Sequence, residues 1–102
     1  MTAKIPVTVL GATGTVGQKF VRLLEDHPWF EIASVAASDQ SAGRLYGDIV
    51  RWRESTPLPP RVAAMTVQRA VPGIPGRIAF SAIEAEIAGE VEQSFAMAGV
   101  FV

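Results

Sequence analysis

The fold of this chain is decided by the stretch Gly11-Ala12-Thr13-Gly14-Thr15-Val16-Gly17, which directly follows the apolar run Val7-Thr8-Val9-Leu10. An apolar strand, a glycine-rich turn and the start of a helix are the usual arrangement for holding a nucleotide diphosphate. Gly11 accommodates a tight turn, Gly14 lets the backbone approach a pyrophosphate, and Gly17 lets the helix lie close to the sheet. The free N–H groups of the first helical turn then face the anion. The spacing is a variant of the dinucleotide-binding fingerprint.

The residues after this turn predict a helix over residues 15–27. Thr13 or Thr15 is the expected N-terminal cap, and Pro28 closes the segment because it disfavours helical geometry at the residue before it. Apolar side chains fall at helical spacing and are expected to pack on a sheet, whereas polar side chains occupy the other side. The apolar set is Val16, Phe20, Leu23 and Leu24, and the polar set is Gln18, Lys19, Arg22, Glu25 and Asp26.

A second apolar run, residues 32–37, completes a βαβ unit whose right-handed crossover makes the two strands parallel neighbours. The later elements are expected to be a short helical stretch at 45–52, a proline-rich loop at 56–60, strands at 64–69 and 78–82, a helix at 83–98 ended by Gly99, and a strand starting at 100–102. The sequence therefore predicts an α/β fold, a Rossmann-like parallel sheet with flanking helices.

Length and composition agree with one small domain. The chain has 102 residues, 49% of them hydrophobic and 19% charged, which is enough to bury one core. We therefore expect residues 1–102 to form a single NAD(P)-binding domain of the Rossmann type. The final apolar strand is cut short, so we also expect that this is the N-terminal part of a longer protein.

The charge and the residue counts exclude several classes of function. A net charge of −1 gives little support for nucleic-acid binding, and membrane-spanning apolar runs are absent from the sequence. The sequence has no cysteine, so it holds neither disulfides nor a thiol nucleophile, and one histidine without a tight acidic cluster predicts no bound metal. The N-terminus enters a strand directly without a secretory signal, and we expect a cytoplasmic location.

The residues after the second strand bear on the choice of nucleotide. An acidic residue at this point accepts the ribose hydroxyls of NAD, whereas the 2′-phosphate of NADP needs hydroxyls and a cation. Ser38, Ser41 and Arg44 form a candidate phosphate pocket, and Asp39 is a candidate ligand for NAD. A third interpretation is a polar turn in which Asp39 points to solvent.

Several segments together resemble aspartate-semialdehyde dehydrogenase, in the branch found in archaea and fungi. They are LGATGTVGQKFV at 10–21, HP at 27–28, AAS at 36–38, SAG at 41–43 and FSA at 80–82. The resemblance implies reversible, NADPH-dependent reduction of aspartyl phosphate to aspartate semialdehyde in amino-acid biosynthesis. It covers only the N-terminal part of such an enzyme, whose catalytic cysteine and histidine lie further along. This chain is therefore expected to contain no catalytic residue and to be inactive alone, and the full-length enzyme is expected to be a homo-oligomer.

The resemblance also implies which residues hold the cofactor. Ser38 and Ser41 match contacts to the 2′-phosphate, with Arg44 where a lysine is usual, and Ser81 and Ala82 line the nicotinamide side. The pyrophosphate is expected to lie on the glycine turn, with Gly11, Thr13, Gly14, Thr15, Val16 and Gly17 as its residues. NADP is therefore the expected cofactor.

Other hypotheses remain open. Gln40 stands where the family often has a basic residue, which leaves NAD possible. The segment at 46–52 also resembles malonyl-CoA reductase, a relative that uses the same cysteine thioester chemistry on a different acyl donor. A hypothesis from another class is a stand-alone nucleotide-binding or interaction module.

Overall fold

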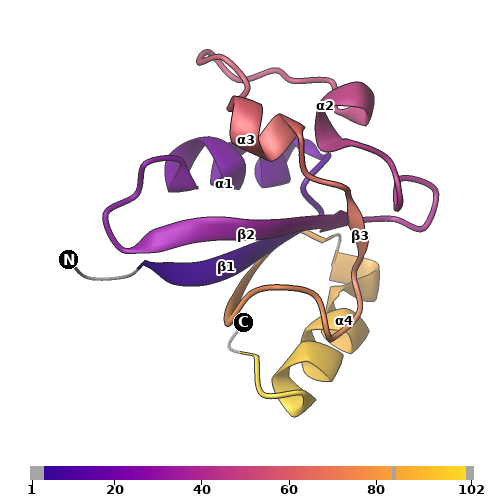
Figure 1. The fold of residues 1–102 in the computed structure, drawn as a ribbon. Helices are drawn as coiled ribbons and strands as arrows, with labels where there is room; N and C mark the ends of the chain where they lie inside the picture. The colour runs from indigo at the N-terminus through magenta and orange to yellow at the C-terminus, as the bar shows by residue number, and fades with distance from the viewer. Residues whose placement is uncertain (1–3, 84, 101–102) are drawn as a thin grey trace.

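In the computed structural model, which describes residues 4–83 and 85–100, four strands form one parallel sheet in the order β3-β2-β1-β4. The elements along the chain are β1 (Ile5–Leu10), α1 (Thr15–Leu24), β2 (Phe30–Ala37), α2 (Tyr46–Ile49), α3 (Pro60–Ala63), β3 (Gln68–Arg69), β4 (Ile78–Ser81) and α4 (Ala85–Met97). Helices α1, α2 and α3 cover one face of the sheet, and α4 covers the other (Figure 1). The predicted Rossmann-like α/β fold is confirmed.

The strand order places a switch in direction beside β1. The chain moves from β1 to β2 on one side and later returns to add β4 on the other, so that Leu10 pairs with both Ala36 and Ser81. The amides of Gly11 and Ala12 then both donate to Ala36 O, at 2.9 and 3.0 Å. Ligands of open α/β sheets bind outside the carboxyl ends of the strands at such a switch point.

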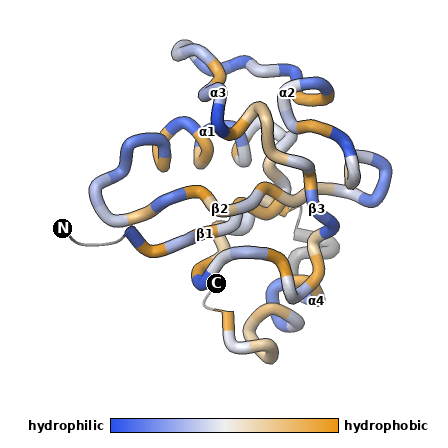
Figure 2. The backbone as a smooth tube through the Cα atoms, in the orientation of Figure 1, coloured by the Kyte–Doolittle hydropathy of each residue, from blue (hydrophilic) through white to orange (hydrophobic). Residues whose placement is uncertain are grey.

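Two apolar layers hold the sheet between its helices. The larger layer faces α1, α2 and α3 and includes Val9, Val21 and Ile32. The smaller layer faces α4, where Phe95 packs with Leu10. Figure 2 shows hydrophobic, orange segments in both central strands and in the helices on either side of them. Because both faces are covered, the strands can be apolar on both sides, which explains the continuous apolar runs in the sequence.

Helix α1 differs from its prediction at both ends. It stops at Leu24 because Glu25 is already extended, with ψ of 129°, and Asp26 follows in the left-handed conformation, with φ of 58°, so the predicted extension to residue 27 is wrong. At the other end Gly14 is the N-cap residue and no side chain makes a capping hydrogen bond. The predicted cap by Thr13 or Thr15 is therefore also wrong, and the first turn keeps its amides free of a side-chain cap.

The buried face of α1 agrees with the predicted one only in part, because Leu24 is buried and Phe20 packs against the core. Val16 and Leu23 are 54% and 61% exposed, whereas Gln18, assigned to the solvent side, is only 3% exposed. The reason is a close approach at Gly17, which brings this residue and Val21 against the rest of the domain. Periodicity alone could not detect this rotation, because a glycine adds nothing to an apolar pattern.

The later elements are partly as predicted. The stretch at 45–52 contains the single turn α2, and the strand at 78–82 is β4. The strand expected at 64–69 is reduced to β3, because α3 starts at Pro60 inside the predicted loop and the amides of Ala64 and Met65 still donate to its carbonyl groups. Proline is favoured at a first helical position, where its missing N–H costs no hydrogen bond.

The end of α4 agrees with the sequence. Gly99 has φ of +87°, its N–H donates to Ala96 O, and the Val100 N–H donates to Phe95 O, both at 3.0 Å. This pair of bonds is a Schellman cap, which requires a residue that tolerates the left-handed region. Most of the strand predicted from residue 100 onward, at residues 101 and 102, lies outside the described part.

Candidate functional site

A hollow of about 270 Å³ lies at the carboxyl edge of the sheet, at the switch point beside β1. Its lining comes from the residues at or after the ends of all four strands and from α4. Most of these side chains are small, so the hollow exposes backbone. The lining residues are Gly11, Thr13, Gly14, Ala37, Ser38, Ala70, Ala82, Ile83 and Val91.

The three glycines of the turn face different surroundings. Gly11 has φ of +73°, and a Cβ on it would lie 2.8 Å from Ala82 O. A Cβ on Gly17 would overlap the Gly11 carbonyl and lie 2.7 Å from the Cα of Ala12. At Gly14 the closest atom to an added Cβ is 3.7 Å away, an ordinary contact. The protein itself therefore requires Gly11 and Gly17, whereas the absent side chain of Gly14 leaves space in the hollow, as a cradle for a pyrophosphate requires.

The start of α1 presents backbone donors to this region. The Gln18 N–H makes the first intrahelical bond, to Gly14 O at 2.9 Å. The amides of residues 15–17 precede that bond and have no acceptor within the helix. Together with the helix dipole, these amides favour an anion at this end of α1.

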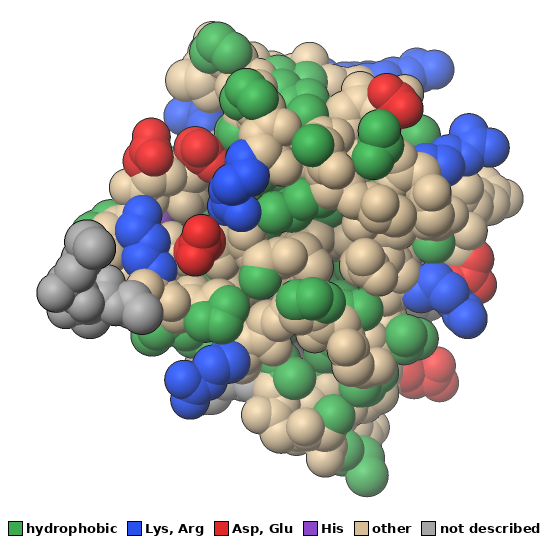
Figure 3. All heavy atoms as spheres, viewed as in Figure 1, with side chains coloured by type: hydrophobic (Ala, Val, Ile, Leu, Met, Phe, Trp, Pro, Cys, Tyr) green, Lys and Arg blue, Asp and Glu red, His purple; other side chains and the backbone are tan. Residues whose placement is uncertain are grey.

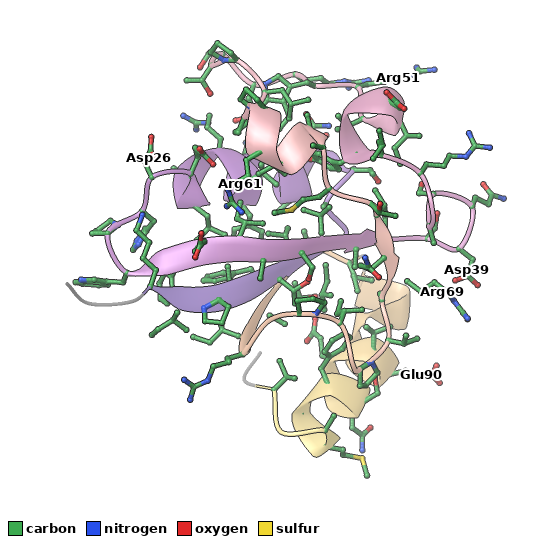
Figure 4. The ribbon with its side chains drawn as sticks, viewed as in Figure 1. Asp26, Asp39, Arg51, Arg61, Arg69 and Glu90 are labelled. Carbon is green, nitrogen blue, oxygen red and sulfur yellow. The ribbon has the colours of Figure 1, made fainter. Side chains whose placement is uncertain are left out.

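The end of β2 separates two candidate ligands. Ser38 lines the hollow, whereas Asp39 is turned away and pairs with Arg69 of β3, with Nε to Oδ1 at 3.0 Å (Figure 4). The side chain of Asp39 is 78% exposed. Strand β2 ends at Ala37, and Asp39 lies in the turn that the Ser41 and Ala42 amides close on Ser38 O, so its side chain leaves the direction of the strand.

Ser41 and Arg44 lie beside the main hollow. They line a neighbouring open hollow together with Gln40 and Asp48. The Ser41 N–H donates to Ser38 O at 3.0 Å, so one short turn joins the two hollows. The structure thus brings the predicted phosphate ligands to one corner of the sheet edge.

Of the remaining predicted cofactor residues, some line the main hollow and others do not. Ala82 lines the main hollow, but the Ser81 hydroxyl donates to Glu92 Oε2 at 2.7 Å and lines a separate apolar hollow with residues such as Phe80. Val16 is exposed on α1 and Thr15 faces another hollow, which it shares with Arg51 and other residues. Ser81 and Val16 are therefore not brought to the hollow that Gly14 lines.

Sequence reasoning missed Gln18 as a residue of this region. Its buried side chain and Arg53 line the same hollow as Thr15, at the start of α1. A polar residue at one helical position gives no sequence signal of burial, because its partners lie 33 and 35 residues further along.

Binding to a membrane, a metal or a nucleic acid requires particular features of the described residues. None of the helices in the described ranges has the length and apolar character needed to cross a membrane. Within those same ranges, no three His, Cys, Asp or Glu side chains gather as metal ligands. Figure 3 shows acidic and basic side chains interspersed on the face that it displays.

A glycine turn at the start of a helix, placed at the switch point of a parallel sheet, defines a nucleotide-binding domain of the Rossmann class. Residues 6–102 match the family described as semialdehyde dehydrogenase, NAD binding domain, and the chain belongs to this family. The family resemblance found in the sequence is confirmed.

Relatives from fungi and an archaeon support the same assignment. The chain is 43% identical over 103 residues to aspartate-semialdehyde dehydrogenase of Cryptococcus neoformans, which covers 97% of this chain and 28% of that protein. It is 44% identical over 97 residues to the enzyme of that name from Archaeoglobus fulgidus, covering 94% and 28%. The crystal structure of the Candida albicans enzyme with NADP superposes with a TM-score of 0.90 at 40% identity, covering 96% and 28%. The chain thus spans little more than a quarter of the length of these relatives.

Proposed function

We propose that this chain is the cofactor-binding part of an NADP-dependent aspartate-semialdehyde dehydrogenase, and that residues 1–102 form one NAD(P)-binding domain. The observation that carries the proposal is Gly14, where neither backbone conformation nor packing demands glycine and the missing side chain opens into the hollow. The likeness to the Candida albicans enzyme, whose structure contains NADP, supports the same ligand.

Three parts of the dinucleotide have candidate ligands at the sheet edge. The pyrophosphate is assigned to the turn formed by Gly11, Thr13, Gly14, Thr15, Val16 and Gly17, through backbone amides rather than through the exposed side chain of Val16. Ser38, Ser41 and Arg44 are assigned to the 2′-phosphate, and Ala82 to the nicotinamide side. Ser81 is assigned there as well, although its hydroxyl is engaged by Glu92. When bound, the nicotinamide supplies the hydride chemistry, and the protein supplies binding and orientation.

The preference for NADP over NAD rests on charge. Arg44 offers a cation and two serines offer hydroxyls, whereas the carboxylate of Asp39 is occupied by Arg69. A charge-assisted contact to phosphate contributes about 1.5–3 kcal/mol, which is a factor of about ten or more in affinity. NAD with Asp39 as the ribose ligand is the alternative.

Calorimetric titration with NADPH and NADH tests this preference. We expect tighter binding of NADPH by the unmodified protein, and about tenfold weaker binding of NADPH, but not of NADH, after Arg44→Ala. Arg77→Ala is the matched control, because it removes the same charge from an exposed residue that lines a different hollow. Equal or tighter NADH binding, with no loss in Arg44→Ala, would identify Asp39 as the ribose ligand.

We also propose that this chain does not turn over alone. Reduction through an acyl-enzyme requires a nucleophile, and the sequence contains no cysteine. Purified protein is expected to show no phosphate-dependent oxidation of aspartate semialdehyde with saturating NADP, and turnover above a buffer control would contradict this. The malonyl-CoA reductase alternative differs from the proposed function in its acyl substrate. It is tested by assaying a cysteine-containing full-length enzyme with each acyl donor.

The coding sequence after residue 102 tests the hypothesis of a stand-alone nucleotide-binding or interaction module. A continuation with a downstream cysteine supports the enzyme, and a stop codon supports a stand-alone binding module. The cytoplasmic location and the homo-oligomeric state of a full-length enzyme remain predictions.

A further inference from the structure

Two side chains from different helices hold the carbonyl groups of the glycine turn. The hydroxyl of Tyr46, on α2, donates to Ala12 O at 2.7 Å. The side-chain amide of Gln18, on α1, donates to Thr13 O at 3.0 Å. Both donors are buried, and Tyr46 is fully enclosed. Two consecutive carbonyl groups are therefore directed toward the protein.

Gln18 also holds a second segment. Its Nε2 donates to Arg51 O at 3.1 Å, and its Oε1 accepts from the Arg53 N–H at 2.8 Å. Both donor hydrogens and the acceptor of this amide are thus engaged. The result is that residues 51–53 lie against the start of α1, where Arg51 and Arg53 line one hollow with Thr15.

Peptide geometry explains why these contacts matter for an anion. A trans peptide directs its N–H opposite to its C=O, so the bond from Tyr46 to Ala12 O turns the Thr13 N–H away from α2. Loss of a buried donor leaves a carbonyl unsatisfied, which favours rotation of that peptide toward solvent. A carbonyl rotated toward the hollow would repel a phosphate there.

We propose that Gln18 and Tyr46 are positioning residues of the cofactor site, which orient the peptide groups of the turn and, through Gln18, keep residues 51–53 beside it. This inference rests on the proposed binding of NADP. Neither side chain needs to touch the nucleotide, because both act through the backbone. A tyrosine hydroxyl is protonated at neutral pH and can donate there, and burial raises the pKa of Tyr46 further above that range.

The test compares Gln18→Met and Tyr46→Phe, which remove the polar groups and keep most of the side-chain volume. We expect each variant of the 102-residue protein to bind NADPH at least about tenfold more weakly by calorimetry, because a carbonyl group that has lost its buried donor is no longer held away from the ligand. Gln18→Met should also weaken the salt dependence of binding, because Arg51 and Arg53 lose their fixed position.

A matched control separates positioning from stability. Val21 is fully buried on the same helix, and Val21→Ala lowers stability by leaving a cavity without altering these hydrogen bonds. We expect this variant to unfold more readily and to keep its NADPH affinity. An equal loss of affinity in Val21→Ala would overturn the inference, because destabilisation alone would then explain the other two variants.

Amide hydrogen exchange gives a readout that needs no nucleotide. The Arg53 N–H should exchange faster in Gln18→Met but not in Tyr46→Phe, because only Gln18 accepts from it. Unchanged exchange in Gln18→Met would overturn the part assigned to this residue. If the unmodified protein fails to bind NADPH, the proposed function falls and the inference with it. If it binds NADPH and both variants bind equally well, the inference alone is overturned.

Discussion

The two sides of the glycine turn differ in what holds them. On the inner side, Gly11 and Gly17 contact backbone so closely that an added Cβ would collide, and Tyr46 and Gln18 bond to the carbonyl groups. On the outer side, Gly14 has only ordinary contacts and opens into the hollow. The comparison shows that glycine occurs in one motif for different reasons, since two glycines serve the fold and one leaves space for a ligand.

The largest effect is expected from Gly17→Ala on the inner side. The new Cβ would overlap the Gly11 carbonyl, and rigid backbone cannot move aside as a flexible side chain can. Overpacking of this kind costs about 3 kcal/mol or more of unfolding free energy. Gly89→Ala is the matched control, because its Cβ would meet no atom within 4 Å and alanine favours a helix by about 1 kcal/mol. Urea denaturation followed by circular dichroism measures both, and equal stabilities would remove the distinction between the two sides.

Gly14→Val should give the opposite result on the outer side. The side chain would occupy ligand space at the start of α1, so NADPH affinity is expected to fall on the order of 100-fold. The unfolding free energy should change by no more than about 1 kcal/mol, because an added Cβ meets no close atom there. Calorimetric titration and urea denaturation of the same variant provide the measurements. Unchanged NADPH affinity would contradict the assignment of Gly14 to the cofactor.

Tyr46 predicts an alkaline instability on the inner side. Its pKa is raised in the folded protein by burial, so the unfolded chain loses this proton first as the pH rises. The contribution of the Tyr46 proton to the unfolding free energy is complete below the ordinary tyrosine pKa of about 10. Above that pH the contribution declines by about 1.4 kcal/mol per pH unit.

Urea denaturation from about pH 9 to about pH 11 checks this decline. Tyr46 is the only tyrosine of the chain, so tyrosinate absorbance reports on it alone. Tyr46→Phe should lack this part of the pH dependence, and identical profiles for the two proteins would show that Tyr46 is not protected in the folded state.

The smallest effect is expected at the ion pair between Asp39 and Arg69, at the ends of β2 and β3 and away from the glycine turn. Both side chains are mainly exposed, at 78% and 63%, and such pairs contribute about 0.5 kcal/mol or less. Asp39→Asn should therefore leave the unfolding free energy and the NADH affinity almost unchanged. Weaker binding of NADH in this variant would show that Asp39 contacts the ribose.

Prediction from the sequence succeeded where the cause was local. The first βαβ unit follows from apolar runs, glycine spacing and the short connection between its strands, and the Gly99 cap follows from the conformational freedom of glycine. Prediction of the face of α1 was right for Phe20 and Leu24 but failed for Val16 and Leu23, because an apolar pattern contains no information on the close approach at Gly17.

The sequence by itself determined the class of fold and the position of the glycine turn, because these depend on residue order, periodicity and backbone freedom. It indicated the family through the resemblance of its motifs to those of aspartate-semialdehyde dehydrogenase. Only the tertiary structure decided that Gln18 is buried, that Tyr46 reaches Ala12 O and that Asp39 pairs with Arg69. These contacts join residues 30 to 35 positions apart, apart from the one that Gln18 makes with Thr13. They form only when parallel strands bring their carboxyl ends together, and a local pattern cannot specify such partners.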